Sequence, residues 1–269
     1  MNRRCFVAKG IAAGAVACVD SRMLALDSPY PENHARSERK VTLDAKPEKL
    51  DLDLSRTAIL VIDMQNDFCS KGGLLDLQAV DVSIVRSVVA PIQKVLTAAR
   101  KAGLRIVYLK MGFRADRSDI GPAGSISWRN YNQDVGRVVR TPGGTEGRTL
   151  VRDTWNTEII DELKPEPRDI VLYKNRFSGF YQTELDSTLK RFGIRFMIVT
   201  GCTTSVCVES TIRDASFCDY SPVLLSDCTA EPEGLDFTRT NYDASLFIIQ
   251  ELFGWTTTSD QFVSILATR

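Results

Sequence analysis

Three side chains of complementary chemistry stand at the ends of separate apolar runs in the sequence. Asp63 ends one such run, Lys174 follows a second, and Cys207 follows a third run and the turn that comes after it. A cysteine near a helix N-terminus is a good nucleophile, because backbone N–H groups and a nearby lysine lower the thiol pKa. A carboxylate can take the thiol proton and later activate water. Together the three side chains could hydrolyse an acyl compound without a histidine.

Each of these residues also has a plain structural interpretation. A carboxylate after a strand can cap the following turn, as Asp63 or Asp67 could. A lone lysine at a strand end is often a solvated charge, and buried cysteines such as Cys202 and Cys218 are usually packing residues. The turn before Cys207 favours the nucleophilic role for that thiol, and its N–H groups could bind a tetrahedral oxyanion.

Histidine is nearly absent from the sequence. The 269 residues include seven cysteines and one histidine, His34, which lies in a proline- and charge-rich stretch over 27–50 that is predicted to be a linker. A catalytic role for His34 is therefore not expected, and a single histidine cannot build a His-rich metal site. No Cys-x-x-Cys pair occurs, which argues against zinc ribbons and thioredoxin-like motifs. Acid–base catalysis must use other side chains.

Alternating strands and helices must position the three candidate residues. This alternation predicts an α/β fold, with a doubly wound, mostly parallel sheet and helices on both faces. Ligands bind beyond the carboxyl ends of the strands in such sheets, so Asp63, Lys174 and Cys207 are expected to share one cleft. The predicted strands are 57–63, 104–109, 169–173, 194–200, 222–227 and 253–256, and the predicted helices are 81–102, 159–163, 183–192, 206–218, 236–252 and one that ends at 267.

The segment 112–150 shows no clear periodicity and is rich in glycine, proline, arginine and serine, so it is expected to be functional or mobile. Trp128 and Arg129 within it could contact a substrate or simply pack. No glycine-rich phosphate-binding motif occurs, and Lys71-Gly72-Gly73 is interpreted as a turn. The 34 basic and 34 acidic residues balance, which argues against a nucleic-acid partner or an anionic membrane surface.

The N-terminus resembles an export signal. Arg3-Arg4 precedes a small apolar run over 11–19, and the pattern is similar to a twin-arginine signal with an A-x-A-like cleavage site over 15–17. The run is too short to span a membrane, and Cys18 hints at lipidation. The alternative is a mobile extension of a cytoplasmic enzyme, so both a periplasmic and a cytoplasmic location stay open. We expect an extension or signal plus linker over 1–45 and one domain over 46–269.

Three separated blocks resemble the isochorismatase-like cysteine hydrolases. They are VIDMQNDF over 61–68, Lys174, and TGCTTSVCVEST over 200–211, and the similarity runs over about 50–265. Within that family the sequence is most similar to the ureidoacrylate amidohydrolases of pyrimidine degradation. The residues that carry this resemblance are 169–172, Arg176, 178–180, Thr183, 185–186, 207–214 and the tail LFGW over 252–255.

The resemblance implies a three-layer α/β sandwich with an Asp63–Lys174–Cys207 triad. It also implies a cis peptide between Cys202 and Thr203, oxyanion donors at the N–H groups of Thr203 and Cys207, and a homo-oligomer with Trp155 and Trp255 as candidate contact residues. Phe68, Trp128 and Phe177 are expected to bind the substrate. Family members that bind a metal use an aspartate and two histidines, so the lack of histidine in the body predicts no metal and no cofactor, and makes nicotinamide an unlikely substrate.

The resemblance also leaves the substrate open. Phe177 stands where the ureidoacrylate enzymes usually have tyrosine, and the loop after the second predicted strand differs from theirs. The expected reaction is hydrolysis of a linear C–N bond in a small ureido, carbamoyl or amide compound through a thioester. The alternatives are a vinyl-ether hydrolase of the isochorismatase type, in which no cysteine nucleophile is needed, and a non-catalytic binding protein on the same fold.

Overall fold

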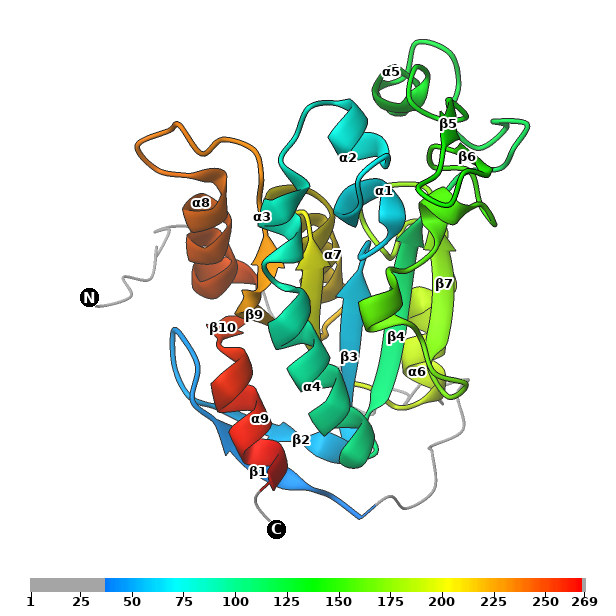
Figure 1. The fold of residues 1–269 in the computed structure, drawn as a ribbon. Helices are drawn as coiled ribbons and strands as arrows, with labels where there is room; N and C mark the ends of the chain where they lie inside the picture. Colours follow the sequence, from blue (N-terminus) through cyan, green and yellow to red (C-terminus); the bar gives the residue numbers. More distant parts are fainter. Residues whose placement is uncertain (1–36, 268–269) are drawn as a thin grey trace, which may run out of the picture. The chain divides into compact units, whose positions relative to one another are not determined.

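Parallel strands form the central sheet of the body, and the computed structural model describes residues 37–267 (Figure 1). The predictions for residues 1–36, including the export signal, Cys18 and His34, lie outside the described residues. The apolar runs of the sequence form six strands in the order β10-β9-β8-β3-β4-β7, and all neighbouring pairs are parallel. The strands are β3 (Thr57–Ile62), β4 (Arg105–Met111), β7 (Ile170–Lys174), β8 (Phe196–Cys202), β9 (Ser221–Ala230) and β10 (Trp255–Thr257).

The direction in which strands are added reverses between β3 and β8. The chain proceeds outward from β3 through β4 to β7, then crosses to β8 on the other side of β3 and continues to β9 and β10. Doubly wound sheets bind ligands at such a switch point, beyond the carboxyl ends of the strands. Ile62 of β3 pairs with Gly201 of β8, so the residues that follow these two strands lie side by side.

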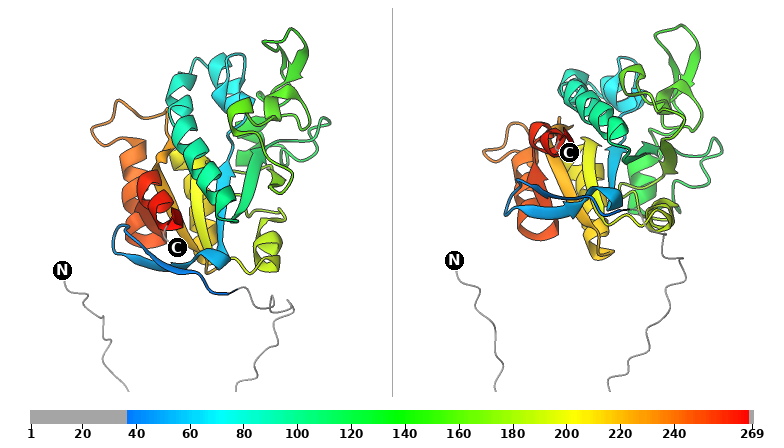
Figure 2. Two further views of the ribbon diagram at one scale, coloured as in Figure 1. Left: turned by 60° about the horizontal axis from the view of Figure 1, so that its bottom comes forward. Right: turned by 90° about the horizontal axis from the view of Figure 1, so that it is seen from below.

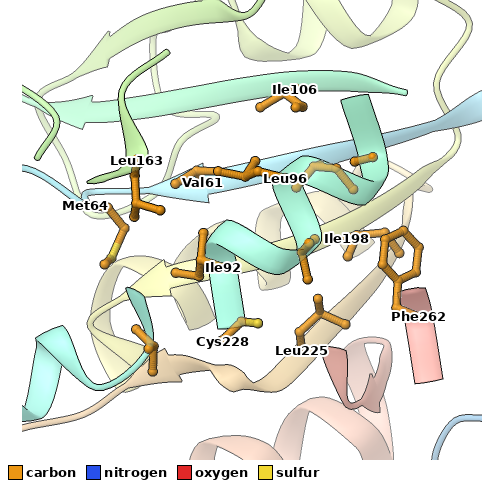
Figure 3. Packing of buried hydrophobic residues seen from close by; sticks show 14 of the residues in the cluster. Val61, Met64, Ile92, Leu96, Ile106, Leu163, Ile198, Leu225, Cys228 and Phe262 are labelled. Atoms are coloured by element: carbon orange, nitrogen blue, oxygen red, sulfur yellow. The ribbon is translucent and has the colours of Figure 1, made fainter. Parts of the chain in front are cut away.

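Helices cover both faces of the sheet, which confirms the predicted fold class (Figure 1). Side chains alternate along β3, so that Ile59 and Val61 join one core cluster while Leu60 and Ile62 join the other. Figure 3 shows the first cluster, where Ile92 and Leu96 lie against strand residues such as Val61. The first face is covered by α3 (Val82–Arg86), α4 (Val89–Lys101) and α9 (Ser259–Ala267), and the second by α6 (Leu185–Arg191), α7 (Glu209–Phe217) and α8 (Asn241–Ile248).

The helix predicted over 81–102 is two helices, α3 and α4, separated at Ser87 and Val88. Pro91 stands in the first turn of α4 and has no N–H, so it cannot continue a helical ladder from the preceding residues. By length and composition alone, Val82–Lys101 could cross a membrane. Its side chains Val85 and Ile92 are fully buried in the first core cluster, as expected of a helix that covers a sheet.

The prediction of a linker over 27–50 is wrong for its C-terminal part. Strands β1 (Lys40–Leu43) and β2 (Leu50–Asp53) form an antiparallel hairpin, so the ordered body extends N-terminal to the expected boundary at 45/46. Leu43 and Leu52 are buried in the first core cluster. Figure 2 shows the hairpin beside α9, at the end of the sheet where the strands begin. The short apolar alternation is interrupted by charges and Pro47, and this hides the strands in the sequence.

The segment 112–150 has regular structure of its own. It contains α5 (Ile126–Tyr131) and a hairpin of β5 (Val138–Arg140) and β6 (Glu146–Arg148), which lie beyond the carboxyl ends of β4 and β7 (Figure 1). A third, smaller cluster that includes Phe113, Tyr131 and Leu150 holds this excursion together. The elements are short and largely exposed, which explains the missing periodicity.

Short helical turns complete the described part of the chain. The helix predicted from 206 starts as a π-helical turn before α7, and the helix predicted over 236–252 is α8 followed by a second π-helical turn. The piece predicted over 159–163 is a single 3₁₀ turn. The remaining elements are η1 (Leu54–Arg56), α1 (Asn66–Cys69), α2 (Leu74–Leu77), η2 (Trp155–Thr157), η3 (Asp161–Leu163), η4 (Thr204–Val208) and η5 (Ile249–Phe253).

Candidate active site

Asp63 is the first residue after β3 and lies at the switch point of the sheet. Its backbone has a φ of 55°, a left-handed conformation that aspartate tolerates better than most residues. The Asp63 N–H donates to the carbonyl of Leu109 at 2.9 Å. Gln65 then fixes the neighbouring strand end, because its side-chain amide bonds both the N–H and the carbonyl of Met111. The Asp63 side chain is therefore held rigidly and is fully buried.

Lys174 ends β7, two strands from Asp63, and its side chain reaches back across the end of β4. Nζ lies 2.7 Å from Oδ2 of Asp63, 3.3 Å from Sγ of Cys207 and 3.2 Å from the carbonyl oxygen of Arg176. The side chain is fully buried. The structure thus brings the predicted carboxylate, amine and thiol into one cluster.

Cys207 lies in the turn that follows β8. Gly201 opens this turn with a φ of 117°, and a Cβ there would lie 2.0 Å from the carbonyl oxygen of Ile62, so only glycine fits. The peptide between Cys202 and Thr203 is cis, as the resemblance implies. The π-helical turn η4 then carries Cys207 into α7. Glu231 supports this turn from β9, because its carboxylate accepts the N–H of Ser205 at 2.7 Å.

Burial dominates the electrostatics of this cluster. Burial raises the pKa of Asp63, although the charge of Lys174 opposes it. Burial lowers the pKa of Lys174, but the negative charge of Asp63 and the hydrogen bonds with Asp63 and Cys207 outweigh that effect and raise it. The 2.7 Å distance between Nζ of Lys174 and Oδ2 of Asp63 is that of a carboxylate–ammonium pair.

Cys207 is a neutral thiol beside this pair. Burial raises the pKa of the thiol, the charge of Asp63 raises it further, and Lys174 only partly opposes them. The prediction that the helix start and Lys174 lower the thiol pKa is therefore wrong, because the sequence shows those two features but not the burial. The thiol must lose its proton as it reacts. Apart from the ion pair, neither oxygen of Asp63 accepts a hydrogen bond of good geometry from a described residue, so this carboxylate can receive the proton.

Some backbone N–H groups of the turn are used within it and others are not. The N–H groups of Val206 and Val208 both donate to the carbonyl of Thr203. The N–H of Thr203 itself donates to no acceptor among residues 37–267. Thr203 and Cys207 both line the pocket described next, which is the arrangement needed for donors that would stabilise an oxyanion.

A small pocket of about 140 Å³ opens onto Asp63 and Cys207. Phe68 and Phe177 line it, as predicted. Trp128 is not among the residues that line it and packs against the cluster that includes Phe113 and Tyr131. The substrate contact of Trp128 stays a prediction. The described residues that line the pocket are Asp63, Phe68, Leu74, Leu75, Met111, Asn130, Tyr131, Asp134, Leu150, Phe177, Cys202, Thr203, Val206 and Cys207.

Two residues of this site have roles that the sequence did not indicate. Asp67 is fully buried and accepts hydrogen bonds from Leu74 N–H, Leu150 N–H and the Asn156 amide, so it joins three segments around the pocket. Burial raises its pKa to about 6 against these hydrogen bonds. Tyr131 lines the pocket from α5, inside the segment that has no periodicity. Asp67 follows Asp63 by four residues in the block over 61–68, so that block could have pointed to it. No sequence motif points to Tyr131.

No group of three or more His, Cys, Asp or Glu side chains that could hold a metal ion occurs among the described residues. The expectation of a metal-free and cofactor-free site stays a prediction.

The chain is similar to known proteins over most of its length. The Isochorismatase domain family matches residues 57–261. The ureidoacrylate amidohydrolase RutB of Caulobacter segnis is 40% identical over 222 residues, which cover 82% of this chain and 90% of that protein. RutB of Serratia proteamaculans is 38% identical and covers 86% and 91% of the two chains.

Two solved structures extend the comparison. A cysteine hydrolase from Pseudomonas syringae pv. phaseolicola superposes with a TM-score of 0.67 and 32% identity, over 80% of this chain and 94% of that chain. An N-carbamoylsarcosine amidase from Thermoplasma acidophilum superposes with a TM-score of 0.57 and 25% identity, over 76% and 97%.

Proposed function

The chain belongs to the isochorismatase family, and on that premise we propose that this amidohydrolase cleaves the C–N bond of a small ureido, carbamoyl or amide compound with Cys207 as nucleophile. The observation that carries the proposal is the cluster in which Lys174 Nζ lies 2.7 Å from Asp63 and 3.3 Å from the Cys207 thiol. The relatives RutB and N-carbamoylsarcosine amidase are named for substrates of this class, with ureidoacrylate the substrate in the name of the former.

Asp63 acts as the general base in the first step. Its raised pKa makes it a stronger base than an ordinary aspartate, and it takes the proton of the Cys207 thiol as sulfur attacks the carbonyl carbon. The N–H groups of Thr203 and Cys207 hold the oxyanion, and the ammonium of Lys174 compensates the negative charge that develops on sulfur. These roles are part of the proposal.

Collapse of the tetrahedral intermediate breaks the C–N bond. The amine leaves with the proton that Asp63 received, and a thioester remains on Cys207, or a thiocarbamate when the substrate is a urea. Asp63, again a carboxylate, takes a proton from water, which attacks the acyl carbon. The free acid and the neutral thiol are then restored, with one water consumed per C–N bond.

The test is a panel of ureido, carbamoyl and primary amide compounds, including ureidoacrylate, with release of ammonia or amine as the readout. Cys207→Ala and Cys207→Ser should abolish turnover while the fold stays intact by circular dichroism. Full activity in either variant would contradict the cysteine mechanism. Failure of an electrophilic amide to label Cys207 would favour the vinyl-ether hydrolase. No turnover of any compound by the wild-type chain would favour a binding protein.

A homo-oligomer and the location of the protein stay predictions, to be tested by light scattering and by N-terminal sequencing of the mature chain.

A further inference from the structure

The hydroxyl of Tyr131 is a buried polar group with no partner. The residue is 6% exposed, and its hydroxyl oxygen makes no hydrogen bond with any described residue. A buried polar group without a hydrogen bond is unfavourable, so one that persists in a site calls for an explanation. Tyr131 lines the same pocket as Cys207, and burial, together with the negative charge of Asp63, raises the pKa of its hydroxyl.

The Tyr131 ring is held in place rather than free to turn away. Its centroid lies 4.7 Å from that of Phe113 and 5.9 Å from that of Phe177, which meets it edge-on. The nearby cation Arg176 is occupied, because its guanidinium donates to the carbonyl oxygens of Asp119 and Asn175. The Tyr131 ring is therefore fixed in the aromatic wall of the pocket, and its hydroxyl is buried without a hydrogen bond from a described residue.

Apart from Tyr131, most of the pocket wall is apolar; its neutral polar side chains are Asn130 and Thr203, and the thiols of Cys202 and Cys207 also line it. Seven apolar side chains from five segments surround the space next to Cys207: Phe68, Leu74, Leu75, Met111, Leu150, Phe177 and Val206. The charged side chains that line it are the carboxylates of Asp63 and Asp134. Asp63 is paired with Lys174, whereas Asp134 has only a hydrogen bond from Gln78 and a 3.8 Å contact with Arg137. An anionic ligand would lose its hydration among apolar groups and be repelled by carboxylates.

We propose that the pocket takes an uncharged urea or amide with a short apolar chain, and that the Tyr131 hydroxyl forms a hydrogen bond with that substrate. The inference rests on the proposed function, since it assumes that the pocket beside Cys207 is the substrate site. It separates this chain from enzymes whose substrates carry a carboxylate, and it makes Tyr131 a residue that determines specificity.

The experiment compares two ligands of similar length that differ in charge. Full-length Cys207→Ala protein is titrated by calorimetry with n-propylurea and with 3-ureidopropionate. The uncharged urea should bind at least tenfold more tightly, because the carboxylate of the second ligand must be desolvated beside Asp134. Equal affinities, tighter binding of 3-ureidopropionate, or no binding of either compound would each overturn the proposal.

Two variants test which side chains cause the difference in affinity between the two ligands. In the Cys207→Ala background, Asp134→Asn removes one charge with little change of shape and should improve the affinity for 3-ureidopropionate several-fold, with that for n-propylurea unchanged. Tyr131→Phe should weaken n-propylurea about three- to tenfold. If Asp134→Asn leaves the ratio of affinities unchanged, the electrostatic explanation fails.

Thermal unfolding tells a substrate contact from a structural role of Tyr131. The phenylalanine variant loses only a hydroxyl without a protein partner, so its Tm should be unchanged or higher. A lower Tm with unchanged affinity would overturn the role of Tyr131. Binding and turnover are separate readouts: loss of the charge preference refutes this inference, whereas turnover that persists in the Cys207→Ala variant refutes the proposed function.

Discussion

Lys174 and Asp63 form a fully buried ion pair, with Nζ 2.7 Å from Oδ2. The two residues come from strands β7 and β3, which are separated in the sheet by β4. A buried pair of charges is costly to desolvate, and removal of one partner leaves the other charge uncompensated. The stability of this end of the sheet therefore depends on the protonation state of Asp63, the proposed base.

Replacement of Lys174 by methionine should damage both stability and activity. The change leaves Asp63 as a lone buried carboxylate, so we expect a loss of about 3–5 kcal/mol in the free energy of unfolding. Asp63 would then take up a proton at neutral pH and could no longer act as a base, so kcat/KM should fall by a factor of about 10²–10⁴. Denaturant unfolding and steady-state kinetics measure the two effects. Lys71→Met, which removes the lysine of an exposed ion pair, is the control and should leave both quantities unchanged.

The raised pKa of Asp67 predicts a definite pH dependence of stability. The folded-state pKa of about 6 lies above the ordinary value of 3.8, so the folded protein binds this proton more tightly than the unfolded chain does. The contribution is fully present below pH 3.8 and is lost as the pH rises through 6. The Tm of the wild type minus that of Asp67→Asn should therefore be larger at pH 5 than at pH 7. A difference that is equal at both pH values, or larger at pH 7, would contradict the assignment.

The positions of the three central residues follow from the sequence because a parallel sheet constrains them. Asp63 and Lys174 stand at the carboxyl ends of apolar runs, and all such ends meet at one edge. The protonation state of Cys207 could not be predicted in the same way. It depends on how completely the neighbouring segments exclude water, and the sequence around the cysteine shows only the helix start and the lysine.

The pocket walls were the least predictable part of the site. Tyr131 reaches the pocket because the segment between β4 and β7 folds on its own small cluster, and elements of three to six residues leave no periodic signal. Trp128, three residues earlier on α5, packs against the same cluster but does not line the pocket. The sequence suggests Trp128, the larger aromatic residue, as the substrate contact. Packing between distant segments decides which side chain of α5 lines the pocket.

Gly201 should not tolerate a side chain. Its φ of 117° is unfavourable for any other residue, and a Cβ would lie 2.0 Å from the carbonyl oxygen of Ile62. Gly201→Ala must therefore push β8 away from β3 next to the cis peptide, and we expect severe loss of soluble folded protein. Gly103 is the matched control, since its φ is 73° and a Cβ there would meet nothing within 4 Å. Gly103→Ala should cost only about 1 kcal/mol, as measured by denaturant unfolding.

Glu231 should act as a positioning residue for the turn that carries Cys207. It is 3% exposed, and its two oxygens accept the N–H groups of Ser205 and Glu233. Glu231→Gln replaces one acceptor by an NH₂ group that faces an N–H donor, which should loosen the turn and misalign the proposed oxyanion donors. We expect kcat to fall about tenfold with KM little changed, because the interaction lost is one that is strongest in the transition state.

The exposed neighbour Glu233 provides the comparison for Glu231, because Glu233→Gln changes the same charge two residues away without touching the carboxylate that holds Ser205. Its kinetic constants should match those of the wild type. Equal losses of kcat in the two variants would mean that the local negative charge matters rather than the hydrogen bond to the turn. A rise in KM with unchanged kcat in Glu231→Gln would instead place the effect on substrate binding, and would contradict a role in aligning the oxyanion donors.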